Sequence, residues 1–321
     1  MSPRELDEDD VRIRPGRGSR PRTRTRPGHE DAQDAFVVTV DRGRYRLRLA
    51  NGVQVSAVRA RELGRRAVVV GDHVAVVGDV SGGPDALARV VRISPRTSVL
   101  RRTPDDNDPI ERAVVANAQI LVVVTALADP VPRPRLIDRC LVAAYDGGLE
   151  PLLCLTKSDL ASPDDLLALY RPLGVEAVVT SPDTGVAELA ERLGNRTSVL
   201  FGQSGVGKST LVNQLVPDAF RAVGDVSGVG KGRHTSSSAI ALELPGGGTV
   251  IDTPGIRSFG LGAVSPERVL AAFELGVVAE ECPPGCNHLP EAPTCALDEA
   301  DIDAGRLDSL RRLLIALSGD D

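Results

Sequence analysis

A glycine-rich octapeptide, Gly202-Gln-Ser-Gly-Val-Gly-Lys-Ser209, limits the possible folds of this chain more than any other feature. An apolar run at 198–201 precedes it, and a helical pattern follows Lys208. This is the full phosphate-loop pattern, in which glycines let backbone N–H groups turn inward around a polyphosphate. Lys208 would then reach the terminal phosphates, while the Ser209 hydroxyl ligates Mg²⁺. The alternative, a chance glycine-rich loop, is disfavoured by the strand before it and the helix after it.

A second phosphate-side motif, Asp252-Thr-Pro-Gly255, directly follows the apolar run at 249–251. A carboxylate at the end of a buried strand can hold the water shell of Mg²⁺. Gly255 can bring its N–H to the γ-phosphate because it has no Cβ. The pattern is weak alone, but its position behind a strand and downstream of a phosphate loop makes it informative.

Thr156-Lys-Ser-Asp159 follows another predicted strand, at 151–155, and has the form that reads guanine. The Asp159 carboxylate would accept hydrogen bonds from the ring N1–H and the exocyclic amine, a donor pair that adenine lacks. The aliphatic stem of Lys157 can lie along the base. Ser181, after the predicted strand at 175–180, is a candidate backbone contact to the guanine oxygen. This base-reading motif disfavours a small-molecule kinase built on the same phosphate loop.

The order of these motifs is unusual, because the base-reading segment precedes the phosphate loop and Asp252 follows it. This order indicates a circularly permuted GTPase domain. The motif at 252–255 is the second of the two segments expected to change conformation with the nucleotide, that is, the second switch. The chain after it runs directly into a C-terminal segment and can pass this motion to it. The only lysines are Lys157, Lys208 and Lys231, and two of them lie in the nucleotide motifs. Their placement indicates sites that need a compact ammonium rather than a generic cation.

The glycine-rich loop at 223–235 supplies the predicted switch residues. Thr235 is expected to join Mg²⁺ only when γ-phosphate is present. His234 is a candidate for orienting the attacking water, with a loop histidine in a structural hydrogen bond as an equal alternative. The position after Gly255, where many GTPases place a water-orienting Gln, is Ile256 here. Isoleucine cannot hydrogen-bond, so we predict slow intrinsic hydrolysis that needs help from a partner or another loop.

The nucleotide site expected from the sequence draws on all of these motifs. Its binding residues are Thr156, Lys157, Asp159, Ser181, Gly202, Gly205, Gly207, Lys208, Ser209, Thr210, Thr235, Asp252 and Gly255. The catalytic candidates are Lys208, His234 and Thr235, and the direct Mg²⁺ ligands are Ser209 and Thr235.

Strand and helix patterns alternate from Gln119 to Asp252 and predict a doubly wound α/β sheet. Residues 35–100 instead read as five short strands between turns, which suits a small barrel such as an OB-fold. That region carries eleven arginines against five acidic residues, although the whole chain has a net charge of −6. Arginines 42, 44, 46 and 48 are predicted on one strand face, where they repel one another unless something anionic is near. A solvated strand face is the alternative.

Residues 11–28 hold seven arginines among Pro, Gly and Thr, with no acidic residue. No apolar periodicity is present, so this segment cannot bury a core and is expected to be disordered alone. An arm that binds RNA phosphate is the functional interpretation, and a solvated tail is the alternative. The chain has no apolar run long enough to span a membrane and no visible secretory signal pattern. Its five cysteines, three of them clustered, do not form a disulfide scaffold, which favours a reducing cytoplasm.

The C-terminal part contains three cysteines and one histidine in close spacing: Cys282, Cys286, His288 and Cys295. Three thiolates and one imidazole form a Cys₃His set for a closed tetrahedral Zn²⁺ site. The Pro-Pro-Gly turn at 283–285 brings two sulfurs to one ion, and no open coordination position is indicated. One structural zinc ion is therefore expected, with reduced cysteines in a small core as the alternative. Cys140 and Cys154 lie in apolar patterns and are predicted to be core residues.

Together these features resemble the RsgA/YjeQ family of ribosome small-subunit-dependent GTPases. The resemblance covers about residues 35–300. It rests on segments 96–100, 137–139, 156–159, 202–209, 232–235 and 252–255 and on the four cysteine and histidine residues. It implies an OB-fold, GTP hydrolysis stimulated by the small ribosomal subunit, and ribosomal RNA contact by the barrel and the zinc domain. In the family, the histidine matching His234 is suspected in hydrolysis.

Three features depart from the family pattern. Thr156 replaces the commoner Asn, and the zinc ligands are separated by three and six residues rather than the more usual four and five. The C-terminus, Ser-Gly-Asp-Asp321, is acidic where relatives often carry a basic tail. RNA contact through that tail is therefore not expected here.

The sequence thus predicts four parts: a disordered arm (1–34), an OB-fold RNA-binding domain (35–100), a circularly permuted GTPase domain (101–262) and a helical zinc-binding domain (263–321). We expect a cytoplasmic monomer that binds GTP or GDP with Mg²⁺. The resemblance implies that it binds the small (30S) ribosomal subunit and its 16S rRNA, and couples GTP hydrolysis to late subunit maturation and to its own release. The alternative function is a GTP-switched rRNA-binding chaperone with negligible turnover.

Overall fold

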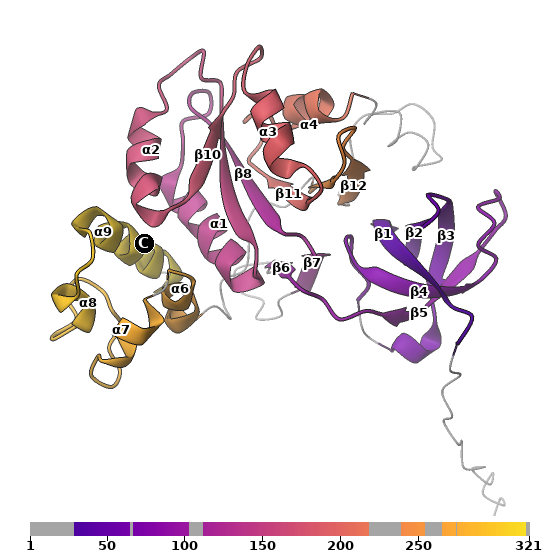
Figure 1. The fold of residues 1–321 in the computed structure, drawn as a ribbon, viewed down its shortest axis with the longest axis horizontal. Coiled ribbons are helices and arrows are strands. Elements are labelled where there is room, and N and C mark those ends of the chain that lie inside the picture. The colour runs from indigo at the N-terminus through magenta and orange to yellow at the C-terminus, as the bar shows by residue number, and fades with distance from the viewer. Residues whose placement is uncertain are drawn as a thin grey trace, which may run out of the picture. The chain divides into compact units, whose positions relative to one another are not determined.

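The computed structural model describes residues 29–64, 67–102, 112–217, 239–253, 265–273 and 275–318. Among the described residues, the helices and strands lie within Asp31–Asp321, the larger of two units into which the chain divides. Their chain order confirms the predicted sequence of a barrel, a doubly wound α/β sheet and a helical segment (Figure 1). The predicted arm at 11–28 and the switch residues Lys231, His234 and Thr235 lie outside the described residues.

The first five strands close into a small barrel. They are β1 (Gln33–Asp41), β2 (Arg44–Leu49), β3 (Gln54–Arg59), β4 (His73–Gly78) and β5 (Ala88–Ile93). β1 pairs with β2 and β4, β2 with β3, and β4 with β5, all antiparallel, and a parallel β3–β5 pair completes the ring. This is the five-stranded OB-fold barrel that the sequence predicts. Alternate residues such as Leu47, Val55 and Val90 fill its interior.

β2 and β3 form a hairpin, with Gly52 at φ +84° and the Val53 N–H donating to Asn51 Oδ1 at 3.0 Å. Arg44, Arg46 and Arg48 alternate with buried residues along β2, which confirms their shared outer face. The predicted four-arginine row is wrong at its first member. Arg42 precedes the strand, in a turn at φ +43°, so that only three arginines share the strand face.

The α/β sheet has the order β10-β9-β8-β11-β13-β12. Its strands are β8 (Ile120–Ala126), β9 (Glu150–Thr156), β10 (Glu176–Val179), β11 (Thr197–Phe201), β12 (Ile240–Glu243) and β13 (Thr249–Asp252). All pair in parallel except β12, which is antiparallel to β13. β12 also pairs with β1 of the barrel at Ile240 and Thr39. The strands expected at 151–155, 175–180, 198–201 and 249–251 therefore hold to within a few residues at each end.

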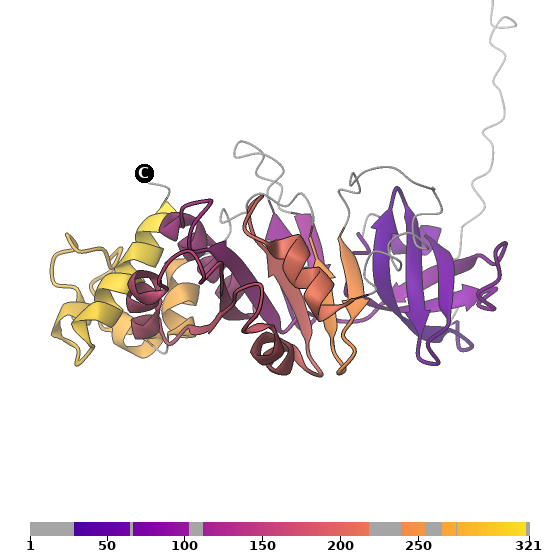
Figure 2. The same cartoon turned by 90° about the horizontal axis from the view of Figure 1, so that it is seen from above.

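Helices cover both faces of this sheet, as is usual for a parallel sheet whose strands are joined by helical crossovers. On one face lie α1 (Pro134–Gly147) and α2 (Asp164–Tyr170), which cluster with Leu121, Val123 and Leu153. On the other lie α3 (Val186–Leu193) and α4 (Lys208–Leu215), which cluster with Val122, Val124 and Leu152. Figure 2 gives a second view of these two helical layers. Cys140 and Cys154 are fully buried, one on each face, which confirms them as core residues.

Sequence patterns did not reveal a short antiparallel hairpin between the barrel and the α/β sheet. Its strands are β6 (Val99–Arg102) and β7 (Arg112–Ala116). Two residues of this hairpin, Leu100 and Val115, are buried and belong to the core on the α1 face of the sheet. Two short 3₁₀ turns, η2 (Arg61–Leu63) and η3 (Arg171–Leu173), lie in the described connections.

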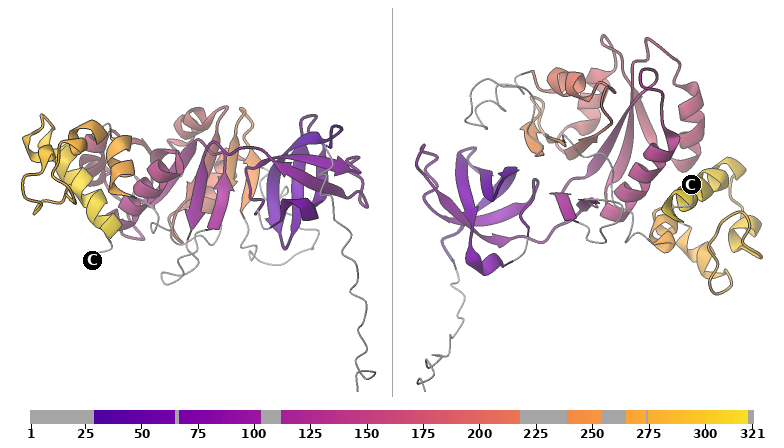
Figure 3. Two further views of the ribbon diagram at one scale, coloured as in Figure 1. Left: turned by 90° about the horizontal axis from the view of Figure 1, so that it is seen from below. Right: turned by 180° about the vertical axis from the view of Figure 1, so that it is seen from behind.

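The C-terminal segment contains α6 (Pro266–Ala272), α7 (Gly276–Glu280), α8 (Ala296–Glu299) and α9 (Ala304–Ser318). Ser265 and Pro266 occupy the N-cap and first-turn positions of α6, and the Ser265 side chain makes no capping bond. Figure 3 shows α9 beside α1, and buried α9 residues Leu310, Leu313 and Leu314 share a core with α1. In the part of the chain that the model describes, every helix is too short or too polar to cross a membrane.

Candidate nucleotide and metal sites

The phosphate-loop strand, β11, lies in the middle of the α/β sheet, between β8 and β13. From β8 the chain moves outward through β9 and β10, then returns to β11 and continues on the opposite side. The direction of progression therefore reverses between β8 and β11. Ligands of doubly wound sheets bind beyond the carboxyl ends of the strands at such a reversal. The loop that follows β11 begins at this point.

The glycines of residues 202–209 are required by space and by conformation. A Cβ on Gly202 would lie 2.7 Å from the Val124 carbonyl oxygen, so β8 and the loop approach too closely for any side chain. Gly205 and Gly207 have φ values of +83° and +89°, in the left-handed region that favours glycine. Lys208 is the first residue of α4, so the loop leads directly into a helix N-terminus. This geometry is that of an anion-binding loop.

Lys208 and Asp252 meet at the ends of β11 and β13. The Lys208 ammonium lies 2.6 Å from Asp252 Oδ1, and both side chains are largely buried. The next residue, Thr253, anchors the end of β13 because its hydroxyl donates to the Leu200 carbonyl at 2.8 Å. The phosphate-loop cation and the predicted magnesium-side carboxylate therefore neutralise each other in this structure. A bound polyphosphate and metal would give each of them a new partner.

The base-reading segment touches the phosphate loop directly. The Thr156 hydroxyl is buried and donates to the Val206 carbonyl at 2.6 Å. Threonine thus supplies the hydrogen bond between the two motifs in this chain. Lys157, at φ +59°, donates from its ammonium to the Asp129 carbonyl, while Asp159 is exposed. The sequence motifs at 156–159 and 202–209 are therefore brought together as predicted.

Ser181 follows β10 in a tight turn. Its backbone N–H donates to the Thr184 carbonyl at 3.1 Å, and its hydroxyl lies 2.9 Å from Thr184 Oγ1. A contact between the Ser181 N–H and a guanine oxygen would replace that turn bond. Gly255, Ile256 and the switch pair His234 and Thr235 lie outside the described residues.

One part of this region was not found from the sequence. A pocket beside the phosphate loop is lined by the end of β8, residues 130–133, Leu136 and Gln203. The preceding Asp129 carbonyl accepts the Lys157 ammonium, so this segment touches both nucleotide motifs. Its sequence signal is the Pro130-Val-Pro132 run, which three residues separate from the end of buried strand β8. Such a run indicates a loop and carries no indication of its neighbours.

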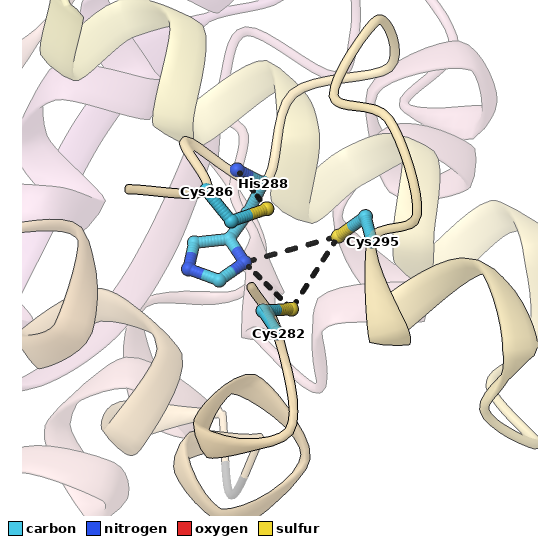
Figure 4. A group of neighbouring side chains, drawn as sticks. All are labelled: Cys282, Cys286, His288 and Cys295. Atoms are coloured by element: carbon cyan, nitrogen blue, oxygen red, sulfur yellow. Dashed lines mark hydrogen bonds between the residues drawn. The ribbon is translucent and has the colours of Figure 1, made fainter. Parts of the chain in front are cut away.

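The four predicted metal ligands converge in the C-terminal segment (Figure 4). One donor atom from each of Cys282, Cys286, His288 and Cys295 lies within 4.8 Å of all the others. His288 Nδ1 lies 3.5 Å from Cys282 Sγ and 3.8 Å from Cys295 Sγ. The four residues could therefore hold one metal ion, and three sulfurs with one imidazole suit a closed tetrahedral site.

Backbone geometry and burial prepare this cluster for a cation. The His288 N–H lies 3.4 Å from Cys286 Sγ and the Ala296 N–H lies 3.2 Å from Cys282 Sγ, bonds that favour thiolates. Gly285, at φ +82°, makes the turn between the first two cysteines. Burial lowers the pKa of His288 and raises the pKa of the Cys295 thiol to about 11. A metal ion would offset that cost, because coordination deprotonates thiols.

The fold and the site define a circularly permuted P-loop GTPase. A central strand feeds a phosphate loop, and the base-reading motif that hydrogen-bonds to the loop comes earlier in the chain. The model of the family described as RsgA GTPase matches residues 93–262. The chain belongs to this family and is a GTP hydrolase.

Relatives and solved structures agree with this assignment. The chain is 42% identical over 267 residues to a protein of Chromohalobacter salexigens named "Small ribosomal subunit biogenesis GTPase RsgA", covering 78% of this chain and 76% of that one. A Pseudomonas putida protein of the same name is 40% identical over 269 residues, covering 79% and 76%. The crystal structure of YjeQ from Thermotoga maritima matches with TM-score 0.65 and 26% identity, covering 90% of this chain and all of that one. YloQ, described as a circularly permuted GTPase, matches in fold with TM-score 0.64 and 22% identity, covering 92% and 98%.

Proposed function

We propose that this GTPase acts on the small (30S) ribosomal subunit, binding it in the GTP form and leaving it after hydrolysis, during late subunit maturation. The similarity to proteins named for small-subunit biogenesis supports the substrate. The bond between Thr156 and the phosphate loop is the observation that carries the nucleotide part, because it assembles base-reading and phosphate-binding motifs into one site. GTP and GDP are the ligands of that site.

The proposed roles of the site residues follow the sequence motifs that contain them. Lys208 leaves Asp252 to bind the terminal phosphates, and Asp252 then faces the water shell of Mg²⁺. Ser209 at the start of α4 and Thr235 ligate the ion, and Asp159 reads guanine. The remaining nucleotide contacts are Thr156, Lys157, Ser181, Gly202, Gly205, Gly207, Thr210 and Gly255. His234 is the candidate that orients the attacking water.

We propose Zn²⁺ as the ion of the cysteine–histidine cluster. Three thiolates and one imidazole are the ligands that zinc prefers, and all four positions are supplied by the protein. The ion is structural in this proposal, because no coordination position is left for a reacting molecule.

RNA binding is proposed for the arm (1–34) and the OB-fold domain (35–100), which are adjacent in the chain. Hydrolysis is assigned to residues 101–262 and metal binding to residues 263–321. Charge supports this division, since residues 36–100 carry eleven arginines against five acids. Arg48 contributes less to an RNA surface than expected. Its guanidinium lies 2.5 Å from Glu243 and stacks over Phe36, so it already has an anionic partner within the chain. A cytoplasmic monomer remains our expectation.

The decisive experiment measures phosphate release from GTP by the full chain, alone and with purified 30S subunits. Because Ile256 cannot orient water, we expect slow release alone and stimulation by about 10²-fold or more on the subunit. Large (50S) subunits serve as the control and should not stimulate. Binding to 30S in the GTP form without stimulated release would instead favour the GTP-switched RNA chaperone. High turnover of the isolated protein would contradict the role given to the subunit.

A further inference from the structure

Two consecutive arginines of α9 hold different parts of the protein. Neighbouring residues of a helix point about 100° apart, so their side chains leave the helix in different directions. Arg311 extends toward the metal centre, whereas Arg312 extends toward α1 of the GTPase domain. The same part of α9 is anchored in the shared core by three buried leucines, Leu310, Leu313 and Leu314. Helix α9 is therefore in direct contact with both functional regions.

The contact between Arg312 and α1 is a buried ion pair. Arg312 Nε donates to Asp138 Oδ2 at 2.8 Å, and the Asp138 side chain is fully buried. The guanidinium also lies over the Tyr170 ring, 5.1 Å from its centroid. Asp138 Oδ1 has no hydrogen-bond partner among the described residues. Removal of Arg312 would leave this buried carboxylate without a paired cation, which is costly.

Arg311 holds the metal centre at two points. Its Nε donates to the His288 carbonyl at 3.3 Å, and its Nη2 lies 2.8 Å from Asp298 Oδ1. His288 is a predicted ligand, and Asp298 belongs to α8, which begins directly after the ligand Cys295. Arg311 thus ties both ligand-bearing segments to α9, and a shift of α9 would move them together.

The other end of this connection reaches the nucleotide site. Helix α1 begins at Pro134, one turn before Asp138, and follows the loop at 129–133. That loop accepts the Lys157 ammonium at the Asp129 carbonyl and lines the pocket beside Gly202 and Gln203. A displacement of the phosphate loop or the base-reading motif would therefore be passed first to the first turn of α1, and from α1 to α9.

We propose that the Arg312–Asp138 pair couples the metal centre to the nucleotide site through α1, so that the bound nucleotide changes how firmly the metal is held. This inference rests on the nucleotide site proposed above and concerns its regulation. Arg312 is a positioning residue, because it contacts the nucleotide motifs and the metal ligands only through other groups. Coupling between two binding sites is reciprocal, so loss of the metal would also change the relative affinities for GTP and GDP.

The test follows zinc release from the zinc-loaded full chain to a chromogenic chelator, with GDP or a slowly hydrolysed GTP analogue bound. We expect the two release rates of the unmodified protein to differ by about fivefold or more, the lower end of typical coupling. Arg312→Gln should reduce the difference to less than about twofold while both nucleotides still bind. The control is Arg268→Gln, which removes an exposed pair between α6 and Asp146 of α1 and should keep the difference.

A second variant separates coupling from stability. Asp138→Leu with Arg312→Met replaces the ion pair by apolar side chains of similar size, a change that often preserves stability. We expect its melting temperature to recover while the nucleotide dependence of zinc release stays lost. Recovery of that dependence would show that packing carries the effect and would overturn the proposal.

Two further outcomes, one in the Arg312→Gln variant and one in the unmodified protein, would also overturn the proposal. One is a nucleotide dependence that survives in Arg312→Gln. The other is an unmodified protein that binds both nucleotides and releases zinc at one rate. Failure of the unmodified protein to bind guanine nucleotides would be a different result, because it would overturn the nucleotide site and the coupling together.

Discussion

The proposed nucleotide site and the proposed metal centre are assembled in opposite ways. The parts of the nucleotide site stand at the carboxyl ends of β9, β11 and β13, far apart in sequence and brought together by strand order. The first and last metal ligands, Cys282 and Cys295, are only thirteen positions apart. Strand pairing and two buried helical layers hold the first site, whereas the second lies among helices of five and four residues.

This difference predicts what each site loses without its ligand. A parallel sheet covered on both faces keeps its shape without nucleotide, because its strands are held by backbone pairing and apolar burial. Helices as short as α7 and α8 are not stable alone, so metal binding contributes to the folding of their segment. Substitutions at the nucleotide site should therefore change function, whereas substitutions of metal ligands should change local folding.

Cys295→Ala is expected to have the largest effect. It removes one of four ligands, and metal binding supplies about 10 kcal/mol of folding free energy in small zinc modules. Hydrogen exchange should show loss of protection from α7 to α8, while guanine-nucleotide binding persists. Asn287→Ala, an exposed position between two ligands, is the control and should keep both properties. A protected C-terminal segment in Cys295→Ala would break the comparison, because the metal would then be dispensable for folding.

Asp159→Asn should have the next largest effect, and on function alone. The amide cannot accept both guanine donors as a carboxylate does, and such losses reduce affinity by about 10²-fold or more. Xanthine nucleotides, which present a carbonyl in place of the amine, should gain affinity. Titration with GDP and xanthosine diphosphate measures the switch, and Asp165→Asn, at an exposed position of α2, is the control. Unchanged GDP affinity would remove Asp159 from the site.

The sequence was sufficient for much of both sites. Local patterns specified the barrel strands, the phosphate loop, the base-reading motif and the four metal ligands, because each depends on residues close together in the chain. The order of motifs was sufficient for the permutation, since parallel strand order follows from it. These features share a physical basis in backbone periodicity and in the ligand chemistry of particular side chains.

Other features could not be predicted because their partners are distant. Arg312 and Asp138 are separated by 174 positions, and no local pattern indicates that they meet. The same holds for Arg48, which was expected to have an anionic group near it and finds one in Glu243 of the distant strand β12. The hairpin β6–β7 was missed because β6 has only four residues, two of them arginines. Tertiary packing decides such contacts, and it is not visible in a single sequence.

Gly202→Ala tests how rigidly the sheet defines the phosphate loop. The added Cβ would lie 2.7 Å from the Val124 carbonyl oxygen and 2.9 Å from Val206 Cγ2, so β8 or the loop must move. We expect a loss of about 2 kcal/mol in stability, typical of forced overpacking, with weaker GDP binding. Calorimetry and nucleotide titration measure these changes. Gly246→Ala is the control, because a Cβ there meets no atom within 4 Å. Equal behaviour of the two variants would show that the loop adapts and that strand order alone does not fix it.

Thr156→Val should have the smallest effect and tests the single bond that joins the two nucleotide motifs. Valine keeps the shape of the side chain but removes the donor to the Val206 carbonyl, which leaves a buried acceptor unsatisfied. That loss is worth about 1 kcal/mol, which corresponds to about fivefold weaker GDP binding. Thr156→Ser keeps the hydroxyl and should bind GDP nearly as well as the unmodified protein, although it loses a methyl group. If the valine variant binds as tightly as the serine variant, the motifs are held together by strand packing alone. The sheet alone would then position the nucleotide motifs, without help from a side-chain hydrogen bond. The contrast with the metal centre, which depends on its own ligands, would become sharper.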